Sequence, residues 1–215
     1  MKKTLFFLLT GIASLTAYAQ QAPRNTDHLL LEKFAPGVAY FHGGGKVETS
    51  LNYTVLYNRL QYTENGEIYD VGNQDQISRV VIDSTVVLVP DPEGGFFRVY
   101  NQGKGDLYFK RTGQVILADK KDPYGGNLPA SNSARVSMAY SDFSRLFVVP
   151  SDYTVKLIDK YYILRDGQYI PFMTLKEMQK AFPDKADAIK AYVKKNKIKF
   201  KTAEDRLSVL DFCLE

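Results

Sequence analysis

The sequence predicts an α+β fold: a mainly antiparallel β domain, built as a meander, sandwich or open barrel, with a C-terminal cap of two to three short helices. Runs of Tyr, Val, Ile and Phe, interrupted by Gly, Asn and Asp, fill residues 37–172. Two dipeptides within that region, Asn65-Gly66 and Asp166-Gly167, are typical of two-residue hairpin turns. Residues 173–215 then change to the apolar spacing of helices.

Residues 1–19 have the three zones of a removable export signal. Lys2 and Lys3 form a positive start, an apolar stretch follows, and Ala17-Tyr18-Ala19 places small residues before the predicted cleavage point. The apolar stretch is too short to span a bilayer comfortably, and no later segment approaches the ~18 apolar residues of a membrane span. We therefore expect signal removal and a soluble mature chain, in the periplasm or outside the cell at its surface.

The first elements after the signal are an arm and a hairpin. Residues 20–36 form a polar N-terminal arm, of which residues 28–31 could dock onto the body as a strand or turn. At Asn65-Gly66, a two-residue loop fixes the register of the strands on either side. It pairs Tyr62 with Tyr69, and the flanking residues follow from that pair.

The remaining strands are expected from β-branched and aromatic runs. Residues 77–89 form a long or bent strand, and shorter strands follow at 96–100, 107–110 and 115–118. Residues 119–137, rich in Gly, Pro, Ser and Asn, are predicted to be a mobile loop. A second β section covers residues 143–172.

Two capping signals and one proline divide the helical subdomain, residues 173–215. Thr174 and Glu177 form a capping box at the start of the first helix. Pro183 ends that helix, and Asp184 is expected to cap the second. Thr202 is expected to cap the third.

Charge argues against a nucleic-acid-binding protein. Without the signal, the chain has 26 basic and 24 acidic residues, a net charge of +2. Such a chain is not a general polycation, so nucleic acid is not an expected partner.

The positive charge is concentrated near the C-terminus. Residues 153–201 contain 12 basic and 5 acidic residues, whereas the rest of the mature chain has 14 and 19. A cluster of this kind could bind an anionic glycan or an acidic envelope protein. The alternative is a solvated helix face followed by a lysine-rich strand. The candidate binding residues are Lys190, Lys194, Lys195, Lys197, Lys199 and Lys201.

Residue types needed for several chemistries are missing. The run His42-Gly43-Gly44-Gly45 could form an esterase oxyanion hole, but the chain has no G-x-S-x-G nucleophile motif. Two histidines and one cysteine do not form a predictable metal site, so we expect no metal and no cofactor. The cysteine, Cys213, is either a small apolar residue of the last helix or a thiol that pairs with another chain.

Three blocks of the sequence resemble a family of exported proteins of Bacteroidota that has no assigned activity. The resemblance spans most of the mature chain and implies export and domain extent, but it implies no site. The blocks are Gly44-Gly45-Lys46 with Leu51-Asn52-Tyr53 and Leu60-Gln61-Tyr62; PYGG…SNS before Tyr140; and KLIDKYYILRDGQYIP with the helical tail AFPDKADAIKAYVKKNKIKFKTAEDRLSVLDFC.

These observations favour a non-enzymatic envelope protein that acts by binding a glycan or a protein. Two alternatives stay open. One is a hydrolase of an envelope or dietary polymer, which needs two carboxylates about 5–9 Å apart in a cleft. The other is a structural or assembly subunit that uses an open sheet edge or Cys213.

Overall fold

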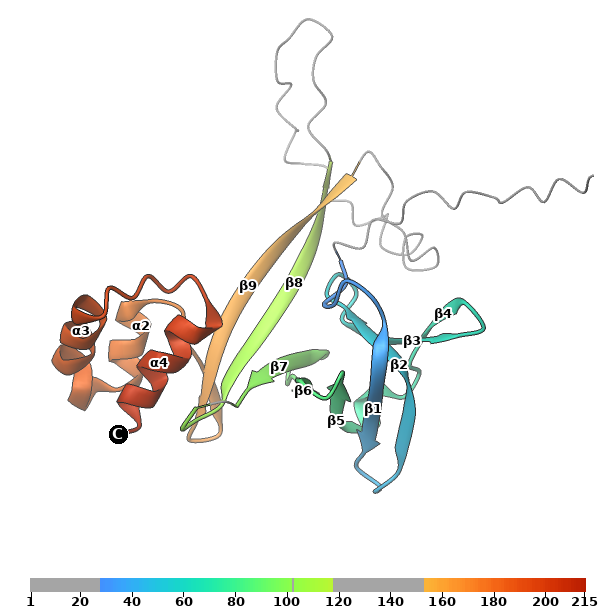
Figure 1. Ribbon diagram of the computed structural model, residues 1–215, viewed down its shortest axis with the longest axis horizontal. Helices are drawn as coiled ribbons and strands as arrows, with labels where there is room; N and C mark the ends of the chain where they lie inside the picture. Colours follow the sequence, from blue (N-terminus) through green and yellow to red (C-terminus); the bar gives the residue numbers. More distant parts are fainter. Residues whose placement is uncertain (1–27, 102, 118–152) are drawn as a thin grey trace, which may run out of the picture.

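The computed structural model describes residues 28–101, 103–117 and 153–215 (Figure 1). Within them, one antiparallel sheet of ten strands is followed by three α-helices, which confirms the predicted α+β class with a C-terminal helical cap. The predicted signal, the loop at 119–137 and the start of the second β section lie outside the described residues. The strands are β1 (Ala35–Phe41), β2 (Lys46–Thr54), β3 (Arg59–Glu64), β4 (Glu67–Asp70), β5 (Ile77–Ile82), β6 (Val86–Pro90), β7 (Phe96–Tyr100), β8 (Leu107–Leu117), β9 (Tyr153–Arg165) and β10 (Gln168–Pro171).

The strand order is β10-β9-β8-β7-β6-β5-β1-β2-β3-β4, which departs from a simple meander at one point. After β4 the chain returns to the middle of the sheet, where β5 pairs with β1. The return contains a short 3₁₀ helix, η1 (Gln74–Gln76). The Gln74 side chain secures it, because its amide accepts from the Leu60 N–H at 3.0 Å and donates to the Asn58 carbonyl at 2.9 Å.

Both predicted two-residue hairpins are confirmed. Asn65 and Gly66 have φ of 52° and 83°, and Tyr62 lies opposite Tyr69. Asp166 and Gly167 have φ of 52° and 75° and join β9 to β10, with Leu164 opposite Tyr169. Pro171 ends the edge strand β10, as expected of a residue that lacks an N–H for the ladder.

Two strand predictions were wrong. Residues 77–89 are not one strand, because Asp83 and Ser84 adopt positive φ (49° and 55°) and turn the chain between β5 and β6. The β-branched residues on both sides of Asp83-Ser84 outweighed the turn preference of these two residues in the prediction. Residues 107–110 and 115–118 are not separate strands either. β8 continues through Gly113, because it pairs with β9 without interruption from Leu107 to Leu117.

The N-terminal segment docks onto the sheet, as the sequence indicated for residues 28–31. Leu29 bridges to Thr54, and the Leu30 N–H donates to the Tyr53 carbonyl at 2.8 Å. The buried Asn52 side chain accepts from the Leu31 N–H at 3.1 Å. The first strand begins at Ala35, so the end of the predicted arm already belongs to the sheet.

Two large cores lie at the two ends of the sheet. The sheet core is formed by side chains of β1, β2, β3, β5, β6 and β7. It contains Ala39, Leu51, Tyr53, Val55, Leu60, Ile77, Val80, Ile82, Val86, Leu88 and Phe96. The cap core joins β8 and β9 to the helices, which Figure 1 shows gathered beside these two strands. A smaller outer patch of Phe97, Val99 and Tyr108 covers the other face.

The helices are α2 (Leu175–Ala181), α3 (Ala186–Lys195) and α4 (Ala203–Cys213). The Thr174–Glu177 capping box and the Thr202 cap are confirmed, since each threonine hydroxyl accepts a backbone N–H of its helix. The prediction that Asp184 caps the second helix is wrong. Pro183 starts a 3₁₀ helix, η2 (Pro183–Lys185), that continues directly into α3, so Asp184 lies inside a turn and caps nothing.

Candidate functional site

The six predicted lysines lie on one continuous segment, residues 190–201, which we call the lysine segment. It consists of the second half of α3 and the stretch that leads to α4. Ile189 and Val193 bury the opposite side of α3 in the cap core. Each of the six lysines is exposed: Lys190, Lys194, Lys195, Lys197, Lys199 and Lys201.

Local sequence explains why the lysines after α3 point outward. Ile198 and Phe200 pack against the cap core, and lysines occupy the alternate positions. The Ile198 N–H donates to the Val193 carbonyl at 3.1 Å, which fixes the stretch to the end of α3. Lys197 and Phe200 have φ of 54° and 56°. The segment is therefore held by apolar anchors rather than by its charges.

The positive charge of the lysine segment is not neutralised by ion pairs within the described part of the chain. None of its six ammonium groups forms an ion pair there. Other lysines are neutralised: Lys46 contacts Glu48 at 2.7 Å, and Lys104 contacts Glu215 at 2.8 Å. A run of unpaired ammonium groups attracts a polyanion.

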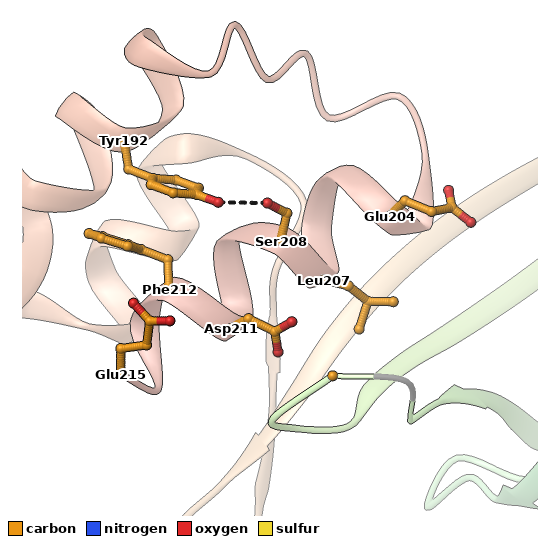
Figure 2. A pocket seen from close by; sticks show the side chains of 8 residues that line it. Tyr192, Glu204, Leu207, Ser208, Asp211, Phe212 and Glu215 are labelled. Carbon is orange, nitrogen blue, oxygen red and sulfur yellow. Dashed lines mark hydrogen bonds between the residues drawn. The ribbon is translucent and has the colours of Figure 1, made fainter.

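A second feature is a pocket of about 400 Å³ on α4, shown in Figure 2. The Tyr192 and Phe212 rings stack along one side, with centroids 4.3 Å apart. The Tyr192 and Ser208 hydroxyls share a hydrogen bond of 2.8 Å. The other lining residues are Gly103, Leu207 and three carboxylates of one α4 face and its end, Glu204, Asp211 and Glu215.

Asp211 and Glu215 are bonded to the β7–β8 connection. The Asp211 Oδ1 accepts from the Lys104 backbone N–H at 2.6 Å, and the Lys104 ammonium contacts Glu215. The hydrogen bond from Lys104 lowers the pKa of Glu215. A Cβ at Gly103 would overlap the Asp211 carboxylate, so glycine permits this approach. Two of the three carboxylates therefore have a structural partner.

The pKa shifts of the acids bear on the hydrolase alternative. A general acid in a glycosidase needs a raised pKa. Glu48, Glu93 and Glu215 have pKa values that are lowered instead, each by a hydrogen bond from a lysine. Among the described residues, no group of three or more His, Cys, Asp and Glu side chains could hold a metal ion.

Cys213 is buried in the cap core, at 3% exposure. Burial raises the pKa of its thiol to about 11. A buried, protonated thiol is a poor nucleophile. The surroundings of Cys213 therefore fit the prediction that it is a small apolar residue of the last helix.

Sequence reasoning missed a row of three arginine–aromatic pairs on the sheet face that carries the helices. Arg98 lies over the Tyr100 ring, Arg111 over Phe109 and Arg206 over Tyr161, at 4.8, 5.3 and 4.1 Å from the ring centroids. We call these six residues the arginine row. Arg98 and Tyr100, like Phe109 and Arg111, are two apart along a strand and so share a face. This spacing was the only signal, and it did not reveal which strands are neighbours.

No protein-family model, curated protein or solved structure matches this chain. None of the helices in the described ranges has both the length and the apolar composition needed to cross a lipid bilayer.

Proposed function

We propose that this is an exported, non-enzymatic protein of the cell envelope that binds an acidic glycan through the lysine segment. One observation carries the proposal: six exposed lysines, none in an ion pair in the described part of the chain, on a segment anchored by buried apolar residues. Export is part of the proposal and rests on the pattern of residues 1–19.

The chemistry of lysine suits an extended polyanion. An ammonium group is a compact charge on a flexible stem and imposes little geometry on its partner. Successive acidic groups of a glycan can therefore contact the segment in several registers. Such binding depends on salt, because exposed charges are screened beyond about 8 Å at physiological ionic strength.

The test is binding of the mature chain, residues 20–215, to polygalacturonate, with neutral dextran as the reference polymer, measured by calorimetry at several NaCl concentrations. The variant carries four reversals, Lys194→Glu, Lys195→Glu, Lys197→Glu and Lys199→Glu. We expect binding to polygalacturonate that weakens with salt and falls at least about tenfold in this variant.

A matched control reverses four exposed basic residues elsewhere: Lys33, Arg59, Lys156 and Lys160. It has the same net charge as the first variant, so it separates local from overall electrostatics. Equal losses in both variants would contradict a site at the lysine segment. If polygalacturonate does not bind but an acidic envelope protein is captured in a lysine-dependent way, the proposed glycan ligand is wrong. The assignment of the lysine segment as the binding surface would then be supported.

The α4 pocket favours a second candidate, the hydrolase. It gathers three carboxylates in one cleft, as that mechanism requires. The lowered pKa of Glu215 and the structural hydrogen bond of Asp211 weigh against it. Loss of polysaccharide hydrolysis on Glu204→Gln, with binding retained, would favour the enzyme.

The assembly alternative is opposed at Cys213 and stays open at the sheet edge. Cys213 is buried, which hinders pairing with another chain. β10 pairs only with Tyr162–Arg165 of β9, so within the described residues the outer edge of β9 over residues 153–160 has no strand neighbour and could accept one.

A further inference from the structure

The arginine row lies across three neighbouring strands beside the start of α4. Arg98 is directly opposite Phe109 in the β7–β8 register, and Phe109 is opposite Tyr161 in the β8–β9 register. The Phe109 ring lies 6.2 Å from the Tyr100 ring and 5.0 Å from the Tyr161 ring, centroid to centroid. The three rings thus form one aromatic strip, and each carries a guanidinium group.

In the part of the chain that the structure describes, one of the three guanidinium groups is neutralised by an ion pair. Arg111 makes a bidentate pair with Asp159, at 2.7 and 2.8 Å. Within the described residues, Arg98 forms no ion pair and donates no hydrogen bond. Glu204 and Asp205 also lie close enough to act electrostatically on Tyr100 and Arg206, respectively.

Arg206 has an incomplete set of partners. Its residue is 5% exposed, and one guanidinium nitrogen donates to the Thr202 carbonyl at 2.7 Å. Its Nε is buried and has no hydrogen-bond partner among the described residues. An unsatisfied buried donor costs about 1–3 kcal/mol, and more when the group is charged. Because this Nε is itself buried, an oxyanion would have to displace the groups that cover it in order to use this donor.

We propose that Arg98, Arg111 and Arg206 form a binding site for an oxyanion group, the carboxylate or sulfate that an acidic glycan carries. The planar guanidinium fork matches such oxyanions in a bidentate way, which a lysine ammonium does not. Contact with the rings holds each guanidinium group in place. Arg98 donates no hydrogen bond within the described residues, whereas an oxyanion on Arg111 or Arg206 would share or replace the partners Asp159 and Thr202. The row would give geometric selection where the lysine segment gives long-range attraction.

The position of Arg206 connects the arginine row to the lysine segment. Arg206 binds the carbonyl of Thr202, the residue that directly follows the lysine segment. Figure 1 shows this stretch running from α3 to the start of α4, beside β9. The glycan part of the inference rests on the proposed function, whereas the oxyanion site itself does not.

The first experiment titrates the mature chain with sodium sulfate against sodium chloride at constant ionic strength. The readout is the set of arginine Nε–H signals in nuclear magnetic resonance spectra. We expect the signals of Arg98, Arg111 and Arg206 to shift together with one dissociation constant. Arg79 is a matched internal control, since it lies 4.6 Å from the Tyr40 ring centroid, outside the row. Equal shifts at Arg79, or none in the row, would overturn the site.

The second experiment compares Arg98→Gln with Arg79→Gln. Arg98 is partly exposed and takes part in no ion pair within the described ranges, so its loss should leave the fold intact. We expect Arg98→Gln to weaken sulfate binding at least about tenfold, as for a lost charged hydrogen bond, and Arg79→Gln to leave it unchanged. Equal affinity in the two variants would overturn the site. Unchanged thermal midpoints verify that both variants fold.

A last arm separates this inference from the proposed function. A galacturonate trimer and a sulfated disaccharide test which oxyanion source binds, in the wild type and in the variant with four lysines reversed. Sulfate shifts retained in that variant, with polygalacturonate binding lost, would support the site independently. Galacturonate and sulfated sugars that bind equally well to the wild type and Arg98→Gln would overturn the link to acidic glycans.

Discussion

Tyr53 shows how one buried polar atom is accommodated in the sheet core. Its side chain is 3% exposed and meets the Phe96 ring edge-on, with centroids 5.8 Å apart. The hydroxyl accepts from the Phe96 N–H and donates to Asn58 Oδ1, both at 3.2 Å. Burial raises the pKa of this hydroxyl to about 12. The group is therefore held in its neutral form well above its ordinary pKa of 10.0.

This shift predicts a loss of stability at alkaline pH. Between pH 10 and about pH 12 the folded chain keeps the Tyr53 proton and the unfolded chain loses it. The free energy of unfolding therefore falls as pH rises through that window, and the contribution is fully present below it. Urea unfolding at pH 8, 10 and 11 should show a smaller decline in Tyr53→Phe than in the wild type.

The comparison needs two controls. Tyr53→Phe leaves the Phe96 N–H unpaired, so we also expect a loss of about 1–3 kcal/mol at pH 8. Cys213, with a pKa raised to about 11, adds its own decline from about pH 9, so every chain compared, the wild-type reference included, carries Cys213→Ala. Tyr69→Phe, on an exposed side chain, should leave the slope unchanged. Equal slopes in Tyr53→Phe and the wild type would contradict the assignment.

At the scale of elements, turns and caps follow from local chemistry. Asn65-Gly66 and Asp166-Gly167 fix both hairpin registers because the two-residue loop leaves one pairing. Thr174 and Thr202 mark helix starts because a hydroxyl can satisfy an N–H that the helix leaves open. Such signals lie within a few residues of the structure that they determine.

The matched glycines Gly66 and Gly72 test the hairpin turn. A Cβ would meet nothing within 4 Å at either position, but only Gly66 has a positive φ, 83°. We expect Gly66→Ala to lower the free energy of unfolding by about 1 kcal/mol, because an L side chain resists that conformation. Gly72→Ala should change it by no more than about 0.5 kcal/mol. Urea denaturation measures both, and equal effects would contradict the role of φ.

Nonlocal pairing could not be predicted from the sequence. The pairing of β5 with β1 depends on a chain return, and that of β8 with β9 joins strands on either side of residues 118–152. For the same reason the lysine segment could be found from its sequence, whereas the arginine row could not. Its members come from β7, β8, β9 and α4, and only the folded sheet makes Phe109 and Tyr161 neighbours.

At the scale of the whole molecule, the two large cores share one sheet and one side chain. Leu30, on the docked N-terminal segment, packs against both the sheet core and the cap core. Its backbone is fixed to Tyr53 at the end of β2. Leu30 therefore links the sheet core to the cap core by a contact that is independent of the strand pairing.

We expect Leu30→Ala to lower the free energy of unfolding by about 1–3 kcal/mol, since Leu30 is only partly buried. Hydrogen exchange of amides in β2 and in α4 should accelerate together. Leu214→Ala, at a side chain that is 45% exposed, is the control and should change little. Faster exchange in only one of the two elements would show that the cores unfold separately.

The open edges of the finished sheet have a counterpart in the unfinished chain. β4 and β10 offer four residues each to a passing strand, but β8 has eleven residues and is covered only once β9 has been made. A chain that stops short of β9 would present that long, unpaired border together with the uncapped Leu107 and Phe109 side chains. Pairing across residues 118–152 also makes closure slow relative to local hairpins. The hazard of aggregation is therefore greatest during synthesis, before the last third of the chain arrives. Part of it persists in the finished sheet, because β10 does not reach residues 153–160 of β9.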